Sequence, residues 1–108
     1  MKKIKGKNSE DRAEAFLRER GFKILARNYR KIFGEVDLVV EKDGEIWFLE
    51  VKTVNENFPP IEKFDEKKIG RMLKVANTFM EEKRLSSPSR FFLVEVGEEI
   101  KLTEIDAW

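Results

Sequence analysis

Apolar positions in the first third of the chain change their spacing near Gly21. Over residues 9–20 they follow the three-four spacing of a helix that buries one face, and Ser9 can cap its first turn. From Phe22 onward, apolar and polar residues alternate as in a strand, and this pattern breaks at residues 31–34. The first third therefore predicts a helix followed by a strand.

The clearest pattern is a β-hairpin in the middle of the chain. Residues 36–41 and 46–52 are rich in β-branched and aromatic residues, and Asp43-Gly44 between them is a typical two-residue hairpin turn. Such a turn sets the register of the two strands, because it pairs the residues that flank it. The register in turn predicts which side chains lie opposite each other.

The second half of the chain predicts one more helix and two more strands. Apolar residues at three-four spacing follow Asp65, a candidate helix cap, and continue to about Arg84. Residues 90–96 form an apolar run typical of a buried strand. Residues 99–105 follow a short turn and are expected to form an edge strand.

Together these elements predict one α/β domain that spans residues 1–108, in the order α-β-β-β-α-β-β. A chain of 108 residues has room for one hydrophobic core. A strand that follows a crossover helix is expected to lie parallel to its partner through a right-handed connection. The expected architecture is a mixed β-sheet flanked by helices.

Two residue types that the chain lacks narrow its chemistry. There is no cysteine and no histidine, which excludes disulfides, thiolate nucleophiles, imidazole bases and most zinc or copper sites. Carboxylates, lysines and hydroxyls remain. No stretch is long and apolar enough for a membrane span or a secretion signal, so we expect a soluble, cytoplasmic protein with no membrane partner.

The formal net charge of +1 hides an uneven distribution of charge. Residues 1–34 and 58–90 are basic, whereas residues 35–57 and 91–108 are acidic. Alternating blocks can fold into a basic rim around an acidic patch, as in an enzyme that binds polyanions and cations, or into solvated faces without a function. The lysines that precede Ser9 are interpreted as a mobile N-terminal tail, with phosphate contact as the alternative.

Four charged side chains are expected on one face of the predicted hairpin. Its register places Asp37 opposite Glu50 and Glu35 opposite Lys52, and all four project from the same face because strands alternate with period two. Opposed carboxylates repel each other unless a cation lies between them, and Mg²⁺ prefers oxygen ligands. The acid pair is therefore a candidate magnesium site, beside which Lys52 can hold a phosphate oxygen or orient a water molecule.

Each of these residues also has a structural interpretation. A Glu-x-Lys sequence is frequent in charged proteins, and the acid pair can equally lie exposed at the frayed end of a hairpin. Glu10 shares a helix face with Ala13 and Leu17, where it either supplies a further metal oxygen or only interacts with the helix dipole. The aromatic residues are core candidates before they are base-stacking candidates.

Several segments form a recognisable set of motifs: Ser9–Ala13 with Phe16-Leu17, Gly21–Asn28, Gly34–Val39, Phe48–Lys52 and Phe64–Ala76. This set resembles the YraN-like family of bacterial proteins, which is grouped with Holliday-junction resolvases in the PD-(D/E)XK nuclease superfamily. The resemblance covers nearly the whole chain. Lys68 stands at a position where the family has lysine, and Ser9 departs from the glycine that is usual there.

The resemblance implies a restriction-endonuclease-like core with Asp37 and Glu50 as metal ligands and Lys52 as the catalytic lysine. It also implies that Glu10 is the helix-borne acid of resolvase-like members, a further catalytic residue and metal ligand. The cofactor is then Mg²⁺ or Mn²⁺, and the partner is DNA. Because resolvases of this superfamily act as two-fold dimers, a homodimer is implied as well, with the C-terminal strand and Trp108 as candidates for its surface.

The leading hypothesis is a metal-dependent DNA endonuclease that hydrolyses phosphodiester bonds in branched or Holliday-junction-like DNA. Basic residues of the first helix region and of Lys63 to Lys74 are expected to hold phosphates, and the DNA-binding candidates are Arg27, Arg30, Lys68 and Arg71. The alternative is a non-catalytic nucleic-acid-binding module that retains the nuclease fold, which the small size and modest net charge favour. A third interpretation is a scaffold whose charges form surface ion pairs.

Overall fold

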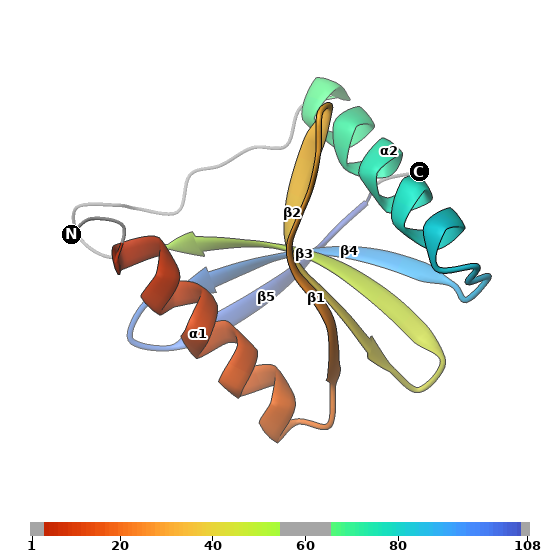
Figure 1. Ribbon diagram of the computed structural model, residues 1–108. Coiled ribbons are helices and arrows are strands. Elements are labelled where there is room, and N and C mark those ends of the chain that lie inside the picture. Colours follow the sequence, from red (N-terminus) through yellow and green to blue (C-terminus); the bar gives the residue numbers. More distant parts are fainter. Residues whose placement is uncertain (1–3, 55–65, 107–108) are drawn as a thin grey trace.

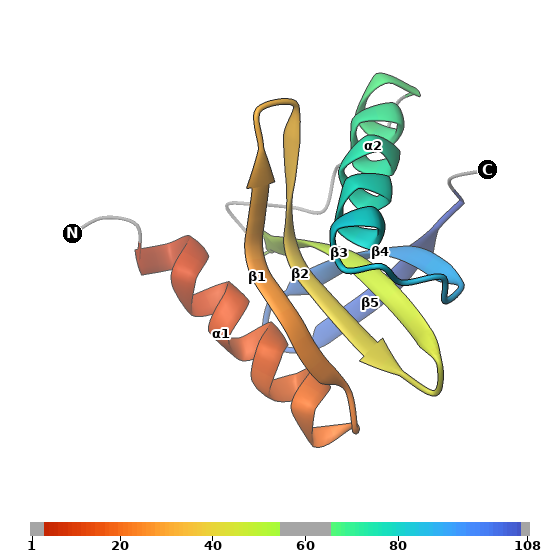
Figure 2. The ribbon, with the colours of Figure 1, turned by 45° about the vertical axis from the view of Figure 1, so that its right-hand side comes forward.

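The computed structural model of the chain describes residues 4–54 and 66–106. These residues form one five-stranded sheet with a helix on each face (Figures 1 and 2). This architecture confirms the predicted α/β class and the order α-β-β-β-α-β-β. In chain order the elements are α1 (Ile4–Glu19), β1 (Lys23–Lys31), β2 (Gly34–Lys42), β3 (Glu45–Thr53), α2 (Glu66–Glu82), β4 (Ser89–Val96) and β5 (Ile100–Ile105).

The sheet is mixed, as the sequence predicts. Its strands follow the order β1-β2-β3-β4-β5, so each strand lies beside its neighbour in the chain. Within this described sheet, β3 and β4 are parallel and the other neighbouring pairs are antiparallel. The chain passes through α2 between β3 and β4, because two parallel neighbours need a long crossover connection.

Helix α1 covers one face of the sheet. Its residues Ala13 and Leu17 are completely buried against Leu38, Leu49 and Val94 of the three central strands. Apolar residues at three-four spacing on the helix thus pack on alternate residues of the strands. The sequence pattern predicts this packing.

Helix α2 covers the opposite face through a separate cluster. Met72, Val75 and Phe79 pack against Phe48 and Phe91, and the rings of Phe48 and Phe79 meet edge to face with centroids 5.8 Å apart. Strands β2, β3 and β4 are therefore covered on both faces, which explains their nearly continuous apolar sequences. A charged residue in the middle of such a strand needs a specific reason to be there.

The start of α1 differs from the prediction. The helix begins at Ile4, so Ser9 is not its N-cap, and Lys5 and Lys7 belong to the helix rather than to a tail. Ser9 is instead buried inside the helix, and its hydroxyl shares a hydrogen bond of 2.5 Å with the hydroxyl of Thr53 on β3. The capping prediction is wrong because the hydroxyl is satisfied by the sheet rather than by the helix backbone.

The predicted end of α1 is correct within one residue. Gly21 has a φ of 88°, and backbone hydrogen bonds run from Gly21 N to Arg18 O at 3.1 Å and from Phe22 N to Leu17 O at 3.0 Å. This is the Schellman arrangement, which stops a helix by a left-handed residue that glycine adopts without steric cost.

Some sequence predictions fall outside the described residues. They are the tail residues Lys2 and Lys3, the helix cap Asp65, the basic residue Lys63 and the candidate interface residue Trp108. No helix in the described ranges is long and apolar enough to cross a membrane.

Candidate metal and nucleic-acid site

Strands β2 and β3 separate at the point where the predicted acid pair begins. Their ladder starts at Lys42 opposite Glu45, as the hairpin turn predicts, and its last pair is Leu38 opposite Leu49. Beyond this pair, β2 remains paired with β1 and β3 remains paired with β4. The two central strands therefore open like a fork, and Figure 2 shows the free end of the β1–β2 hairpin rising beside α2.

Asp37 occupies the base of this fork. Its Oδ2 accepts a hydrogen bond of 2.7 Å from the backbone N–H of Val51. This bond joins β2 to β3 just beyond the end of their ladder. A carboxylate oxygen accepts here the kind of backbone hydrogen bond that a strand carbonyl accepts elsewhere in a sheet. The hydrogen bond holds the carboxylate in place and leaves its second oxygen available.

The expected pairing of Glu35 with Lys52 is wrong, and Asp37 and Glu50 are not a pair of the ladder either, although both line the same pocket. Glu35 lies opposite Arg30 of β1, and Arg30 Nε donates to Glu35 Oε1 at 2.9 Å. The alternation of side chains along a strand predicts this pairing only if β2 and β3 stay paired to their ends, and they do not. Glu35 still lines the same pocket as Asp37 and Glu50.

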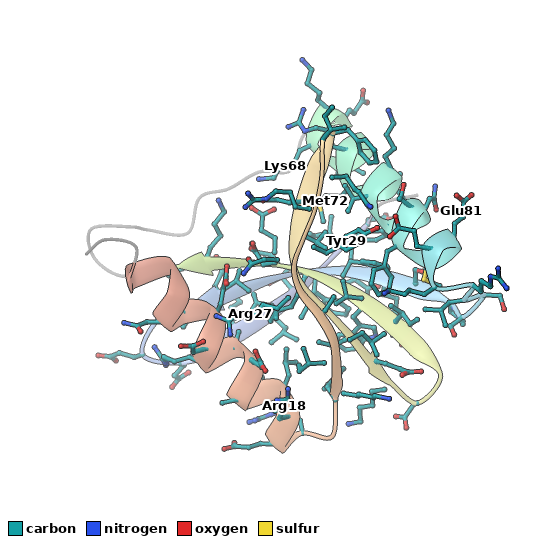
Figure 3. The ribbon with its side chains drawn as sticks, viewed as in Figure 1. Arg18, Arg27, Tyr29, Lys68, Met72 and Glu81 are labelled. Atoms are coloured by element: carbon teal, nitrogen blue, oxygen red, sulfur yellow. The ribbon has the colours of Figure 1, made fainter. Side chains whose placement is uncertain are left out.

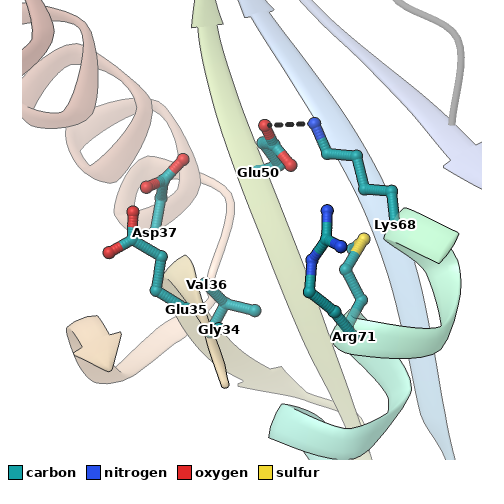
Figure 4. A pocket seen from close by; sticks show the side chains of 8 residues that line it. Gly34, Glu35, Val36, Asp37, Glu50, Lys68 and Arg71 are labelled. Atoms are coloured by element: carbon teal, nitrogen blue, oxygen red, sulfur yellow. Dashed lines mark hydrogen bonds and ion pairs between the residues drawn. The ribbon is translucent and has the colours of Figure 1, made fainter. Parts of the chain in front are cut away.

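The pocket lies between the fork and the start of α2. Figure 4 shows Glu35, Asp37 and Glu50 on the strand side and Lys68 and Arg71 on the helix side. Gly34, Val36 and Met72 complete its lining. The structure thus brings together the predicted metal ligands Asp37 and Glu50 with two of the four predicted DNA-binding residues.

Asp37 is the strongly perturbed acid of this pocket. Its pKa is raised from 3.8 to about 6. Burial is the largest cause, the hydrogen bond from Val51 opposes the shift, and the negative charges of Glu10, Glu50 and Glu35 add to it. The surroundings therefore disfavour a negative charge on Asp37 unless a cation is present. A buried acid with a raised pKa and like-charged neighbours is a frequent property of functional sites.

Glu50 is held by two lysines from different elements. Lys68 of α2 and Lys52 of β3 place their Nζ atoms 3.2 Å and 3.4 Å from the same oxygen, Oε2. Lys52 is thus beside the acid pair, as expected, although it does not line the pocket itself. Lys68 was expected only to hold phosphate, and its contact with Glu50 makes it part of the acid site.

Glu10 lies close enough to Asp37 for its negative charge to contribute to the raised pKa of Asp37. Its own partner is Arg27, whose Nε is 3.5 Å from Glu10 Oε1. Arg27 also binds Asp11 at 2.8 Å and Glu14 at 3.2 Å, which fastens β1 to the acidic face of α1 (Figure 3). Arg27 is therefore engaged by three carboxylates, and its proposed contact with DNA stays a prediction.

The donor set fits a hard divalent cation. The described residues contain no group of three or more acids that could enclose a metal ion by themselves, so Glu10 as a third ligand remains a prediction. Asp37 and Glu50 offer two carboxylates, and Mg²⁺ is commonly held by one or two carboxylates together with water and substrate phosphate. The oxygen-only chemistry and the unfavourable charge on Asp37 both suit such an ion.

Two features of the site could not be seen in the sequence pattern. The bond from Val51 to Asp37 depends on the separation of the strands, and Arg71 reaches the pocket only because α2 lies close to β2. A signal for that approach exists in Gly34, where a Cβ atom would lie 3.1 Å from Val75 Cγ2. A glycine at the start of a strand can thus mark a close contact with a helix.

The fold and the site together define an α/β protein with a carboxylate-lysine site at a fork in a mixed sheet. The chain matches the Uncharacterised protein family UPF0102 over residues 9–96 and belongs to this family, which confirms the YraN-like resemblance. It is 39% identical to the UPF0102 protein of Thermotoga petrophila over 93 residues, which cover 86% of each chain. It is also 40% identical over 111 residues to that of Kosmotoga olearia, covering 96% of this chain and 94% of the relative.

A more distant relative extends the same similarity. The UPF0102 protein of Campylobacter jejuni subsp. doylei is 33% identical over 91 residues, covering 84% of this chain and 81% of the relative. These names describe a family and state no activity. The chemistry of the site is therefore the main indication of a function.

Proposed function

We propose that the protein is a Mg²⁺- or Mn²⁺-dependent endonuclease that hydrolyses phosphodiester bonds in DNA. The observation that supports this most is the position of Asp37, fastened by Val51 N–H at the fork beside Glu50, with Lys52 and Lys68 on the Glu50 carboxylate. Acids and lysines in this arrangement match the requirements of phosphodiester hydrolysis, in which negative charge develops on the phosphate.

In this mechanism Asp37 and Glu50 would hold the ion. When bound, the ion supplies charge neutralisation at the phosphate and lowers the pKa of water. Lys52 and Lys68 share one carboxylate oxygen, so one ammonium can turn to a phosphate oxygen while the other keeps Glu50 paired. A water molecule gives up a proton to the solvent and its oxygen bonds to phosphorus as the bond from phosphorus to the leaving sugar oxygen breaks, and the leaving oxygen takes up a proton from the solvent.

Branched DNA is the substrate that we propose within this class. The resemblance to Holliday-junction resolvases supports it, and so does the cationic wall that Lys68 and Arg71 form opposite the acids (Figure 4). In this proposal these two residues hold the phosphates next to the one that is cleaved.

The test compares labelled duplex, single-stranded and four-way-junction DNA in Mg²⁺, Mn²⁺ and EDTA. We expect cleavage that requires metal, is strongest on the junction, and falls by at least about a hundredfold in Asp37→Asn and Lys52→Ala. The matched controls are Asp43→Asn, in the exposed β2–β3 turn, and Lys101→Ala, exposed on β5. Cleavage that survives Asp37→Asn, or is equally lost in Asp43→Asn, contradicts the proposal.

A second function, a non-catalytic nucleic-acid-binding module, is favoured by one observation. Glu50 already has two lysine partners, so its charge is balanced without an ion. Junction binding that persists in EDTA and in Asp37→Asn, with no cleavage under any condition, would support this function. Absence of DNA binding at low salt would leave only the scaffold interpretation.

A further inference from the structure

The turn between β1 and β2 carries an apolar side chain that the fold does not use. Ile32 is 96% exposed, and it is the large hydrophobic residue that stands out as exposed in the described part of the chain. Single exposed apolar residues are common on protein surfaces and need no explanation by themselves. The position of Ile32 is unusual because the turn is tight and its surroundings are cationic.

The chemistry of the turn does not call for isoleucine. Lys31 pairs with Gly34, so the turn consists of Ile32 and Phe33, and neither has a positive φ. Two-residue hairpin turns are usually built from Asn, Asp and Gly. A β-branched apolar residue at this position therefore contributes little to the turn itself, and its apolar surface is free for a contact outside the chain.

The turn is held firmly against α2. Phe33 packs on the α2-side core, and Lys74 Nζ lies 5.6 Å from the centre of its ring. Gly34 lies so close to Val75 and Arg71 that it has no room for a larger side chain without adjustment. Figures 1 and 2 both show the hairpin end beside the first turns of α2. Ile32 is thus presented on a supported turn rather than on a free loop.

Cationic side chains surround this turn. Arg30 and Lys31 lie on the hairpin and are paired with Glu35 at 2.9 Å and with Glu82 at 2.6 Å. Arg71 and Lys74 lie on the adjoining helix, and neither makes an ion pair within residues 4–54 and 66–106. An apolar tip beside unpaired cations is complementary to a polyanion that exposes apolar faces, and a nucleic acid with unstacked bases has both properties.

We propose that the β1–β2 turn is a nucleic-acid wedge. Ile32 inserts into an interrupted base stack, Lys74 holds a phosphate beside the turn, and Arg71 holds the phosphates nearer the acid site. Asp37 lies five residues along β2 from Ile32, which at about 3.3 Å per residue is roughly 17 Å, or about five base steps of 3.4 Å. The wedge rests on the proposed function in one respect. The DNA strand whose bases it separates is taken to be the strand that reaches the acid site.

A second copy of this chain is a poorer occupant of the same surface. In a two-fold contact the turn would meet its own counterpart, so that Arg71 and Lys74 would face the same cations of the partner. An anionic lipid surface shares the phosphate chemistry but not the fit to a base step. Both become outcomes of the test.

The experiment measures base unstacking without cleavage. The full chain in EDTA is mixed with junction DNA and, separately, with continuous duplex. Both DNAs carry the fluorescent base analogue aminopurine, and in the junction it lies next to the branch point. We expect fluorescence to rise on the junction with the wild type and with Ile32→Leu. With Ile32→Ala we expect the rise to be lost and junction affinity to fall about tenfold, and duplex affinity to change less than about twofold. Because Ile32 is exposed, its substitution should leave the melting temperature unchanged.

The outcomes separate this proposal from the proposed nuclease activity. An Ile32-dependent fluorescence change without any cleavage in Mg²⁺ would sustain the wedge and remove the nuclease. Cleavage with identical fluorescence in wild type and Ile32→Ala would overturn the wedge alone. The wedge is also overturned if Ile32→Ala alters only sedimentation of the free protein or only binding to phosphatidylglycerol vesicles, or if no DNA binding occurs.

Discussion

Asp37 shows how one residue can be costly to the fold and useful to the site. Its hydrogen bond from Val51 N–H stabilises the carboxylate, whereas burial and the nearby charges of Glu10, Glu50 and Glu35 act against its negative charge. The raised pKa shows that the unfavourable effects outweigh the hydrogen bond. Removing the charge should therefore stabilise the fold, and adding a cation should do the same.

The first prediction concerns the stability of the metal-free protein against pH. The folded pKa of Asp37, about 6, lies above the ordinary value of 3.8. The folded state therefore binds this proton more tightly, and stability falls as pH rises from about 4 to about 6. The full loss above that window is at most about 3 kcal/mol. Asp37→Asn keeps an oxygen that can accept from Val51 N–H, so in EDTA at pH 7 it should be more stable than the wild type.

Urea unfolding in EDTA between pH 4 and pH 8 measures this difference. The free energy of unfolding of Asp37→Asn minus that of the wild type should grow with pH across the titration window. Asp43→Asn, which changes the same charge in an exposed turn, should give a flat difference. A flat difference for Asp37→Asn as well would mean that burial does not perturb this acid.

The second prediction concerns divalent ions. Mg²⁺ or Mn²⁺ should raise the melting temperature of the wild type at pH 7.5, because an ion that binds only the folded state stabilises it by mass action. The rise should be smaller at pH 5, where Asp37 is largely protonated. Differential scanning calorimetry of the wild type, Asp37→Asn and Glu50→Gln measures the effect. Equal shifts in all three proteins would place the ion elsewhere.

At the scale of elements, β2 belongs to two structures at once. It pairs with β1 along the whole hairpin and with β3 only up to Leu38. The hairpin end rests on α2 through Phe33 and Gly34. The geometry of the fork that holds the acid site therefore depends on how closely β2 approaches α2. Gly34 permits this close approach because it has no side chain.

The third prediction tests that contact. Gly34→Ala should lower the free energy of unfolding by about 1–2 kcal/mol, because the new methyl group would lie 3.1 Å from Val75 Cγ2 and the helix has to yield. Backbone strain does not contribute, since Gly34 has no positive φ. Val75→Ala, itself destabilising, should remove part of the Gly34→Ala penalty in a double-mutant cycle measured by urea unfolding. Strict additivity of the two substitutions would show that this contact does not limit the approach.

At the scale of the whole molecule, a net charge of +1 is compatible with nucleic-acid binding because the charges are segregated. Three acids of α1 are gathered by Arg27, whereas Arg71 and Lys74 lie beside the acid pocket and the β1–β2 turn. Local complementarity rather than overall charge then governs association with a polyanion.

The fourth prediction concerns how the affinity for junction DNA depends on salt, and the contribution of Arg71 and Lys74 to that dependence. Junction affinity should fall steeply with rising salt, and the double variant Arg71→Ala/Lys74→Ala should reduce the slope of log affinity against log salt by about two. Lys23→Ala/Lys101→Ala removes the same charge from exposed positions on β1 and β5 and should leave the slope nearly unchanged. Fluorescence anisotropy in EDTA measures both. Equal slopes for the two double variants would argue against a localised binding surface.

Much of the architecture follows from local patterns in the sequence. Three-four and two-residue periods, the Gly21 stop and the Asp43-Gly44 turn are enough to predict the elements, their order and the register of β2 with β3 near the turn. These signals are readable because each depends on residues within a few positions of one another. The choice of Asp37, Glu50 and Lys52 as a group followed from the same register.

Tertiary structure alone decided the features that depend on distant segments. Ser9 was expected to cap a helix and instead meets Thr53, and Glu35 was expected opposite Lys52 and instead meets Arg30. Both errors arise because a polar side chain takes the partner that packing brings nearest, and periodicity carries no information about where paired strands part. The local order of residues therefore determined which elements form, while the packing of α2 against β2 determined where the sheet opens and what its acids face.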